Sequence, residues 1–156
     1  MFEVLSDAAI YEFENAPPAS AEFLVHRYER LESRRSANGS ELWLNWVIRL
    51  PSGALAGYVQ ATVVQGDAAY MAYELASRYW RQGIGRTAVR AVLAELATTY
   101  GVKIFLAVLK AKNFRSEALL RSLGFAQTPP QGVALLRCEP DELVMYKPRA
   151  HSENAV

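Results

Sequence analysis

The chain has 156 residues, 51% of them apolar, and a formal net charge of +1. This length and composition predict one globular domain with a sizeable core and exclude an intrinsically disordered chain. The near-neutral charge argues against a nucleic-acid partner, which would require a strongly basic face.

The cysteines, histidines and apolar runs further restrict the class of protein. The single cysteine, Cys138, excludes an internal disulfide and a cysteine-rich zinc site. The only two histidines are His26 and His151, so we expect no metal. Acidic residues stand where a signal peptide would be basic, and no apolar run is long enough to cross a membrane. We therefore predict a cytoplasmic protein with no membrane partner.

The first forty residues favour helices. We expect a short helix over residues 6–14, with Ser6 or Asp7 as its cap. A second helix should run from a cap at Ser20 to about Arg35. The apolar residues of this second helix recur at helical spacing: Phe23, Leu24, Tyr28 and Leu31.

The hydrophobic period then changes to two, which is typical of strands. Alternation predicts a strand over Glu41–Leu50, and the turn Pro51–Gly53 joins it to a second strand, Ala54–Val64. The pair should form an antiparallel hairpin. A third strand is expected over Ala69–Ala76.

Helices and strands alternate in the second half. Four elements follow from its periodicity and turn residues: helices Gly83–Tyr100 and Asn113–Leu123, and strands Val102–Leu109 and Glu142–Lys147. The first strand is a continuous apolar run that should be buried on both faces. The first helix carries a core-facing apolar stripe: Val89, Val92, Leu93, Leu96 and Tyr100. Gly124 follows the second of these helices where a Schellman ending would place it. The fold class is therefore α/β (α+β), a mixed, mostly antiparallel central sheet with helices on both faces. One domain should span residues 1–148, followed by a polar tail at 149–156.

A glycine-bearing segment joins the third strand to the next helix. It reads Trp80-Arg81-Gln82-Gly83-Ile84-Gly85-Arg86-Thr87-Ala88. The N–H groups and positive dipole end of such a helix start suit a diphosphate. An ordinary strand–helix turn, a dinucleotide site and a coenzyme A site are the alternatives. Gly83-x-Gly85-x-x-Ala88 fits the dinucleotide pattern loosely, but two antiparallel strands precede it and no acidic residue ends the next strand.

Two motifs together resemble the GNAT acetyltransferase superfamily over residues 70–125. The loop Trp80–Gly85 is similar to the family pattern Q/R-x-x-G-x-G/A. Asn113-Phe114-Arg115-Ser116 followed by the run Leu119–Phe125 is similar to its N-x-x-S/A … L-G-F helix. Trp80, Ser116 and Leu120 make the chain most similar to the ribosomal-protein-alanine N-acetyltransferase branch.

The resemblance implies a splayed sheet in which acetyl-CoA, a substrate, enters between strands 69–76 and 102–109. Main-chain groups at Tyr73 and Leu75 would bind the pantetheine and the acetyl carbonyl. Asn113 would hydrogen-bond the pantetheine arm, a role compatible with capping its helix. Backbone amides of the loop would hold the diphosphate: Gln82, Gly83, Ile84, Gly85, Arg86 and Thr87.

Catalytic residues are harder to place because the family pattern is broken. Leu120 stands where many members carry a tyrosine acid, so the branch implies Ser116 as the acid or thiolate-binding candidate; otherwise it is simply a first-turn residue. Tyr70 occupies the position of the branch's glutamate base. Glu74 points to the same side of the strand as Tyr70 and is our preferred base, the alternative being a solvated glutamate.

The predicted activity is acetyl transfer from acetyl-CoA to a primary amine in a ternary complex. The acceptor would be a protein N-terminus or a small amine, with Asn45 as a candidate contact, and a homodimer is left open. In the family an N-terminal strand precedes helices that line the acceptor site, but here only Met1–Leu5 is available for that strand. A non-catalytic acyl-CoA-binding sensor or partner-binding module is the alternative.

Overall fold

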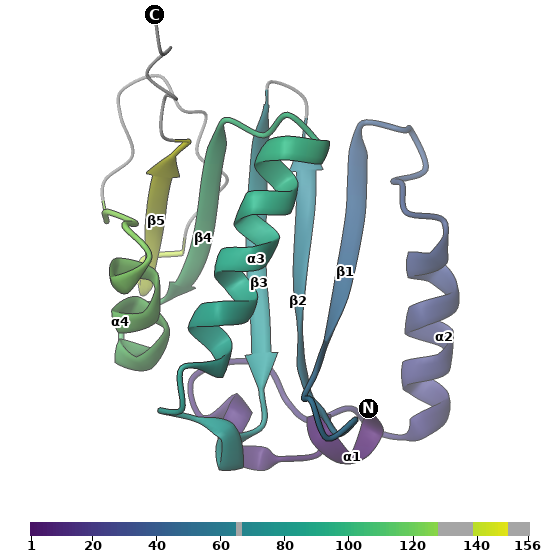
Figure 1. The fold of residues 1–156 in the computed structure, drawn as a ribbon. Helices are drawn as coiled ribbons and strands as arrows, with labels where there is room; N and C mark the ends of the chain where they lie inside the picture. The colour runs from purple at the N-terminus through teal and green to yellow at the C-terminus, as the bar shows by residue number, and fades with distance from the viewer. Residues whose placement is uncertain (65–66, 128–138, 150–156) are drawn as a thin grey trace, which may run out of the picture.

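The computed structural model describes residues 1–64, 67–127 and 139–149. Cys138, His151 and most of the predicted tail lie outside these ranges. Two α-helices come first, three strands follow, and helices and strands alternate only after the third strand, as Figure 1 shows. The α-helices are α1 (Phe2–Leu5), α2 (Ala21–Glu32), α3 (Ile84–Thr99) and α4 (Phe114–Ser122). The strands are β1 (Glu41–Arg49), β2 (Leu55–Val64), β3 (Ala68–Leu75), β4 (Ile104–Lys110) and β5 (Glu142–Pro148).

The strands form one sheet in the order β1-β2-β3-β4-β5. β1 with β2, β2 with β3, and β4 with β5 pair antiparallel, and only β3 with β4 pair parallel. The prediction of a mixed, mostly antiparallel sheet is therefore confirmed. The hairpin of β1 and β2 is also confirmed, with Leu44 opposite Ala61.

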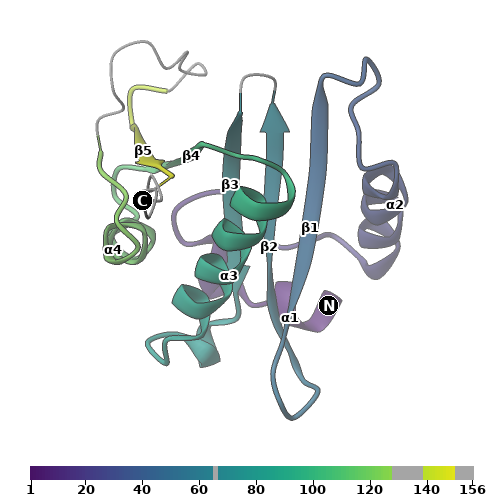
Figure 2. The ribbon, with the colours of Figure 1, turned by 45° about the horizontal axis from the view of Figure 1, so that its top comes forward.

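The main core lies between α3 and one face of the sheet. The predicted stripe on α3 is buried there, at Val89, Val92, Leu93 and Leu96. Alternate strand residues such as Leu44, Val59 and Met71 meet it from the sheet. Figures 1 and 2 show α3 lying across this face, with α4 beside it in front of β4 and β5.

The opposite face of the sheet is covered by α1 and α2. Val4 and Leu5 of α1 and Leu24 of α2 form a second buried cluster with Ala76, at the end of β3. Helices therefore cover both faces, as predicted. Leu24 is only 3% exposed, whereas Phe23 and Tyr28 of the predicted apolar stripe are 53% and 39% exposed, so α2 packs through a narrower face than expected.

The N-terminal prediction is wrong in detail. Residues 6–14 are not one helix: α1 ends at Leu5, and a short 3₁₀ helix follows at Ala8–Tyr11. Asp7 is the cap as proposed, because its carboxylate accepts from the Ala9 N–H. The same carboxylate accepts from the N–H of Ser77, 2.6 Å away, and this bond ties the segment to the end of β3. A tertiary contact thus takes the place of helix continuation.

The ending of α4 agrees with its prediction. Gly124 has φ +85° and donates its N–H to Arg121, while Phe125 donates to Leu120. These two bonds define a Schellman ending. The strand β4 is buried at Phe105, Leu106 and Ala107, as its continuous apolar run predicted.

Candidate active site

The sheet opens between its two parallel strands. β3 and β4 pair only at Ala68–Tyr70, opposite Ile104–Leu106, yet β3 continues to Leu75 and β4 to Lys110. Figure 2 shows β4 and β5 turning away from β3 beyond this point. Within the described residues, the main chain of residues 71–75 therefore has no strand partner on its β4 side.

At this open end α3 begins with an exposed turn. Its N-cap is Gly83, with φ +77°, and no side chain caps the helix. Arg81 also has a positive φ, +59°, so the loop turns twice through the left-handed region. The first N–H groups of a helix lack partners within it. Together with the helix dipole, they make this turn a place where an anion can bind.

Packing holds the loop in this shape. The indole Nε1 of Trp80 donates to the carbonyl of Leu75, 2.7 Å away, so that carbonyl is already paired. A Cβ on Gly85 would lie 3.2 Å from Leu119 of α4 and 3.6 Å from Leu75, which shows how closely the helix start approaches both elements. Arg86 reaches the carbonyl of Ser122 in α4. The turn is thus fixed against β3 and α4.

The start of α4 faces the same opening. Asn113 caps this helix through Oδ1, which accepts from the N–H of Ser116 at 3.1 Å. The phenol of Tyr73 reaches across from β3 and donates to the Ser116 carbonyl at 3.3 Å. Burial raises the pKa of Tyr73 to about 12, so its hydroxyl stays protonated at neutral pH. Ser116 and Tyr73, which both carry a hydroxyl group, therefore contact each other beside the opening.

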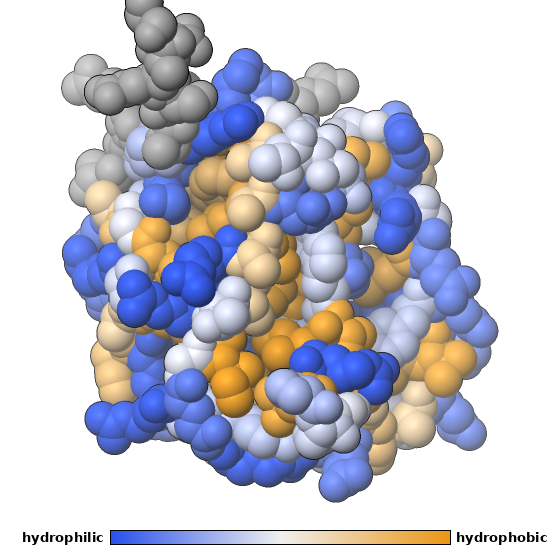
Figure 3. Space-filling model, viewed as in Figure 1, coloured by the Kyte–Doolittle hydropathy of each residue, from blue (hydrophilic) through white to orange (hydrophobic). Residues whose placement is uncertain are grey.

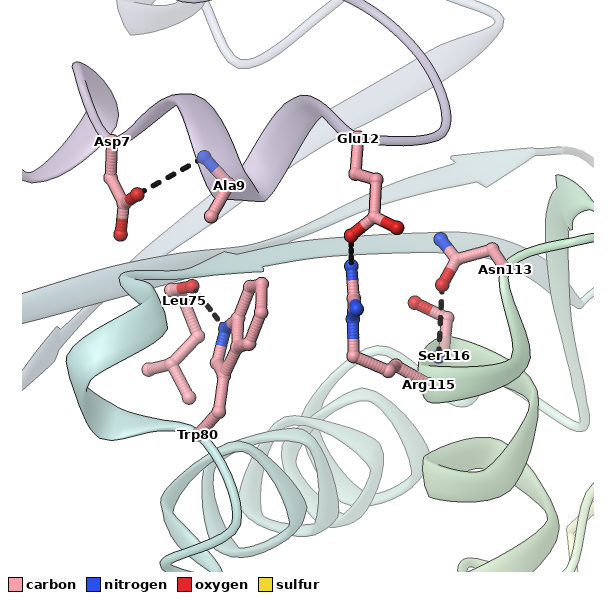
Figure 4. Close-up of polar contacts among 8 residues, drawn as sticks. All are labelled: Asp7, Ala9, Glu12, Leu75, Trp80, Asn113, Arg115 and Ser116. Atoms are coloured by element: carbon pink, nitrogen blue, oxygen red, sulfur yellow. Dashed lines mark hydrogen bonds and ion pairs between the residues drawn. The ribbon is translucent and has the colours of Figure 1, made fainter.

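Arg115, in the same turn of α4, ties the N-terminal segment to this region. Its guanidinium pairs with the carboxylate of Glu12 and lies 4.5 Å from the ring centre of Trp80 and 4.8 Å from that of Phe13. Figure 4 shows Arg115 extending from α4 to Glu12 between Trp80 and Asn113. The Glu12–Arg115 pair therefore joins the chain's N-terminal part to α4 beside the opening.

Glu74 is partly buried on the other face of β3, among tyrosines. Tyr11 donates to its Oε2 at 3.2 Å, and Tyr58, its register partner on β2, also hydrogen-bonds it. Burial raises the pKa of Glu74, and the two tyrosine hydrogen bonds and the charge of Arg27 partly offset this effect. A carboxyl group with a raised pKa accepts a proton more readily near neutral pH.

Comparison with known proteins decides the family. Residues 1–126 match the family model described as an acetyltransferase (GNAT) domain. The chain belongs to the GNAT acetyltransferase family. Among curated proteins, no relative matches the sequence.

Solved structures share this GNAT fold. Spermidine N-acetyltransferase from Vibrio cholerae, solved with CoA and spermine, has a TM-score of 0.70 and 17% identity over 94% of this chain and 86% of that one. The ribosomal-protein-S18-alanine N-acetyltransferase of Escherichia coli has a TM-score of 0.63 and 19% identity over 99% and 92%. An acetyltransferase of the GNAT family from Bacillus anthracis has a TM-score of 0.70 and 14% identity over 95% and 86%. At these identities the likeness shows the fold, and the branch within the family stays a prediction.

The structure places most of the predicted GNAT site residues around the opening. The loop, Tyr73, Asn113 and Ser116 converge there, whereas Tyr70 lies where β3 and β4 part and Glu74 lies on the opposite face of β3 from Tyr73. Leu120, at the family's tyrosine position, is 1% exposed within the core, so it faces no ligand. Asn45 lines a cavity beneath α2, and its role as an acceptor contact stays a prediction.

Sequence reasoning missed the tyrosines around Glu74 and the phenol of Tyr73. Tyr58 carried a usable signal, because the antiparallel pairing of β2 with β3 sets it opposite Glu74. Tyr11 carried none, since only the tertiary path of the N-terminal segment brings it there. Of the helices in the described ranges, none combines the length and apolarity needed to cross a membrane.

Proposed function

We propose that this GNAT protein is an N-acetyltransferase that moves the acetyl group of acetyl-CoA directly to a primary amine in a ternary complex. One observation carries the proposal: β3 and β4 part beyond Tyr70 and Leu106, and the uncapped start of α3 lies at the open end. An extended arm fits beside an unpaired strand edge, and its diphosphate fits the helix start.

The residues present suit coenzyme A. A Cβ on Gly83 would meet nothing within 4 Å, so the space beside this residue is open for a phosphate. Apolar surface remains on both flanks of α3 in Figure 3, which suits the uncharged part of the pantetheine. We assign the diphosphate to the backbone amides of the loop: Gln82, Gly83, Ile84, Gly85, Arg86 and Thr87. The arm would contact main-chain groups of Tyr73 and Leu75 and the side chains of Asn113 and Ser116.

Acetyl transfer to an amine requires two proton movements. The attacking nitrogen must lose a proton, and Glu74, with its raised pKa, is the proposed base, directly or through water. Tyr70, at the parting of the strands, is the second candidate for this role. As the carbon–sulfur bond breaks, the thiolate needs a proton, which the hydroxyl of Ser116 or of Tyr73 would supply. Bound acetyl-CoA supplies the activated thioester itself.

The fold neighbours illustrate two kinds of acceptor, a polyamine and a ribosomal protein. Both carry a primary amino group, and the proposal covers small amines and protein N-termini. Cytoplasmic acetyl-CoA would be the donor for such a protein.

Thiol release from acetyl-CoA, measured across a panel of amines and N-terminal peptides, tests the proposal. We expect turnover with at least one class of acceptor, and Tyr73→Phe and Ser116→Ala should show which hydroxyl is the acid by the larger fall in kcat. Binding of acetyl-CoA without turnover on any acceptor would instead identify an acyl-CoA-binding sensor. No heat with coenzyme A or acetyl-CoA in calorimetry of folded protein would refute the site altogether.

A further inference from the structure

A groove lies between α2 and the β1–β2 hairpin, on the sheet face that carries Glu74. It consists of two adjoining cavities of about 420 Å³ and about 240 Å³. The two cavities share four lining residues: Arg27, Leu31, Asn45 and Gln60. A volume of this size accommodates a small molecule.

The charged residues that line the groove are all arginines. Arg27 and Arg30 line the larger cavity, Arg27 and Arg49 line the smaller one, and no aspartate or glutamate lines either. Within the described part of the chain, none of these three arginines forms an ion pair with a carboxylate. Guanidinium groups in a cavity with amide side chains beside them suit a carboxylate.

Tyr58 connects this groove to Glu74. Tyr58 lines the smaller cavity and stands opposite Glu74 in the pairing of β2 with β3. Arg27 lines both cavities, and its positive charge acts on Glu74, so the groove adjoins the carboxylate. An acceptor amine at Glu74 would therefore have its other end beside Arg27, and a second ammonium group at that end would be repelled.

We propose that the acceptor is a small amine carrying a carboxylate several bonds from its amino group, with this carboxylate bound by Arg27 and Arg30. The inference rests on the proposed acetyl transfer and specifies its substrate class. Because Tyr58 lines the groove and Glu74 does not, ω-amino acids or short peptides fit this arrangement better than molecules whose two charged groups share one carbon. Diamines of equal length should be poor acceptors.

Three chain-length-matched series test this proposal: ω-amino acids, amino alcohols and diamines. Thiol release should give the highest kcat/KM with the amino acids and the lowest with the diamines. Arg30→Gln should reduce the preference for amino acids over amino alcohols about tenfold, because one charge-assisted contact is lost. Arg30→Lys, which keeps the charge, should retain most of that preference. Arg90→Gln, an exposed arginine on α3, serves as the control and should not change it.

A second readout separates this proposal from the proposed function. Calorimetric binding of ω-amino acids and amino alcohols to protein saturated with coenzyme A requires no turnover. Tighter, Arg30-dependent binding of the amino acids supports the carboxylate site even if acetyl transfer fails. Turnover that favours diamines, or a preference for amino acids that Arg30→Gln leaves unchanged, would overturn the carboxylate site while acetyl transfer stands.

Discussion

The substitution Gly83→Ala tests the diphosphate-binding loop with little disturbance of the free protein. Gly83 has φ +77°, and a Cβ built there meets no atom within 4 Å. The added methyl group therefore costs backbone strain and nothing in packing. It does stand beside the Gly83 amide, next to which we place a phosphate.

The two costs differ in size and can be separated. An alanine in the left-handed region loses about 1 kcal/mol, which for a chain of this length lowers Tm by about 2–4 °C. Displacing a phosphate from one charge-assisted hydrogen bond costs about 1.5–3 kcal/mol, or a Kd for coenzyme A raised about tenfold or more. Gly53 offers a matched control, with φ +86° and no atom within 4 Å of a built Cβ, in the β1–β2 turn.

Thermal denaturation and calorimetry with coenzyme A measure the two effects on the same samples. We expect Gly83→Ala and Gly53→Ala to lower Tm alike and only Gly83→Ala to weaken binding. An affinity of Gly83→Ala equal to that of the unsubstituted protein would show that no phosphate lies against this amide. A loss of binding in both would show that the effect comes from stability instead.

Four further predictions concern Glu74 and the strand that supports it. Glu74→Gln should lower kcat about a hundredfold or more with the Kd for acetyl-CoA unchanged, and unchanged kcat would exclude it as the base. Because burial raises the pKa of Glu74, the rate should fall with decreasing pH sooner than for an ordinary glutamate, and this acidic limb should vanish in Glu74→Gln. Tyr11→Phe removes a hydrogen bond that favours the ionised carboxylate, so the pKa of Glu74 should rise further and the acidic limb of the pH–rate profile should move to higher pH. A limb that stays in place would show that Tyr11 does not influence this pKa. Gly57→Ala would put its Cβ 2.0 Å from the carbonyl oxygen of Glu74 and should lower the free energy of unfolding by about 3 kcal/mol or more. The control Gly39→Ala, with no atom within 4 Å of its Cβ, should lower it by about 1 kcal/mol in thermal unfolding. Equal losses in the two variants would contradict the close approach of β2 and β3 at Gly57.

The long elements could be predicted from the sequence because burial imposes a regular period on them. The stripe on α3 and the continuous apolar run of β4 are examples, and both are buried as expected. Residues 6–14 lack such a period, and their path depends on the Asp7–Ser77 bond, whose partners lie far apart in the chain. Local sequence propensity therefore predicts the structure of this N-terminal segment poorly.

The candidate site was predictable in its backbone parts and less so in its side-chain partners. Glycine spacing and a helix start locate the loop, and the Gly83 geometry agrees with that prediction. The parting of β3 and β4 has no signature in either strand's own pattern and followed only from the family resemblance. The burial of Glu74 depends on α1, the 3₁₀ helix and β2 together, which no local pattern reveals.

The hydrogen bond from Tyr11 to Glu74 gives the N-terminal segment a chemical importance that its plain sequence does not suggest. The first dozen residues contribute no motif and only a minor part of the core, yet they help set the pKa of Glu74. A relative with a different N-terminal segment would therefore keep the same loop and the same sheet but have its highest rate at a different pH.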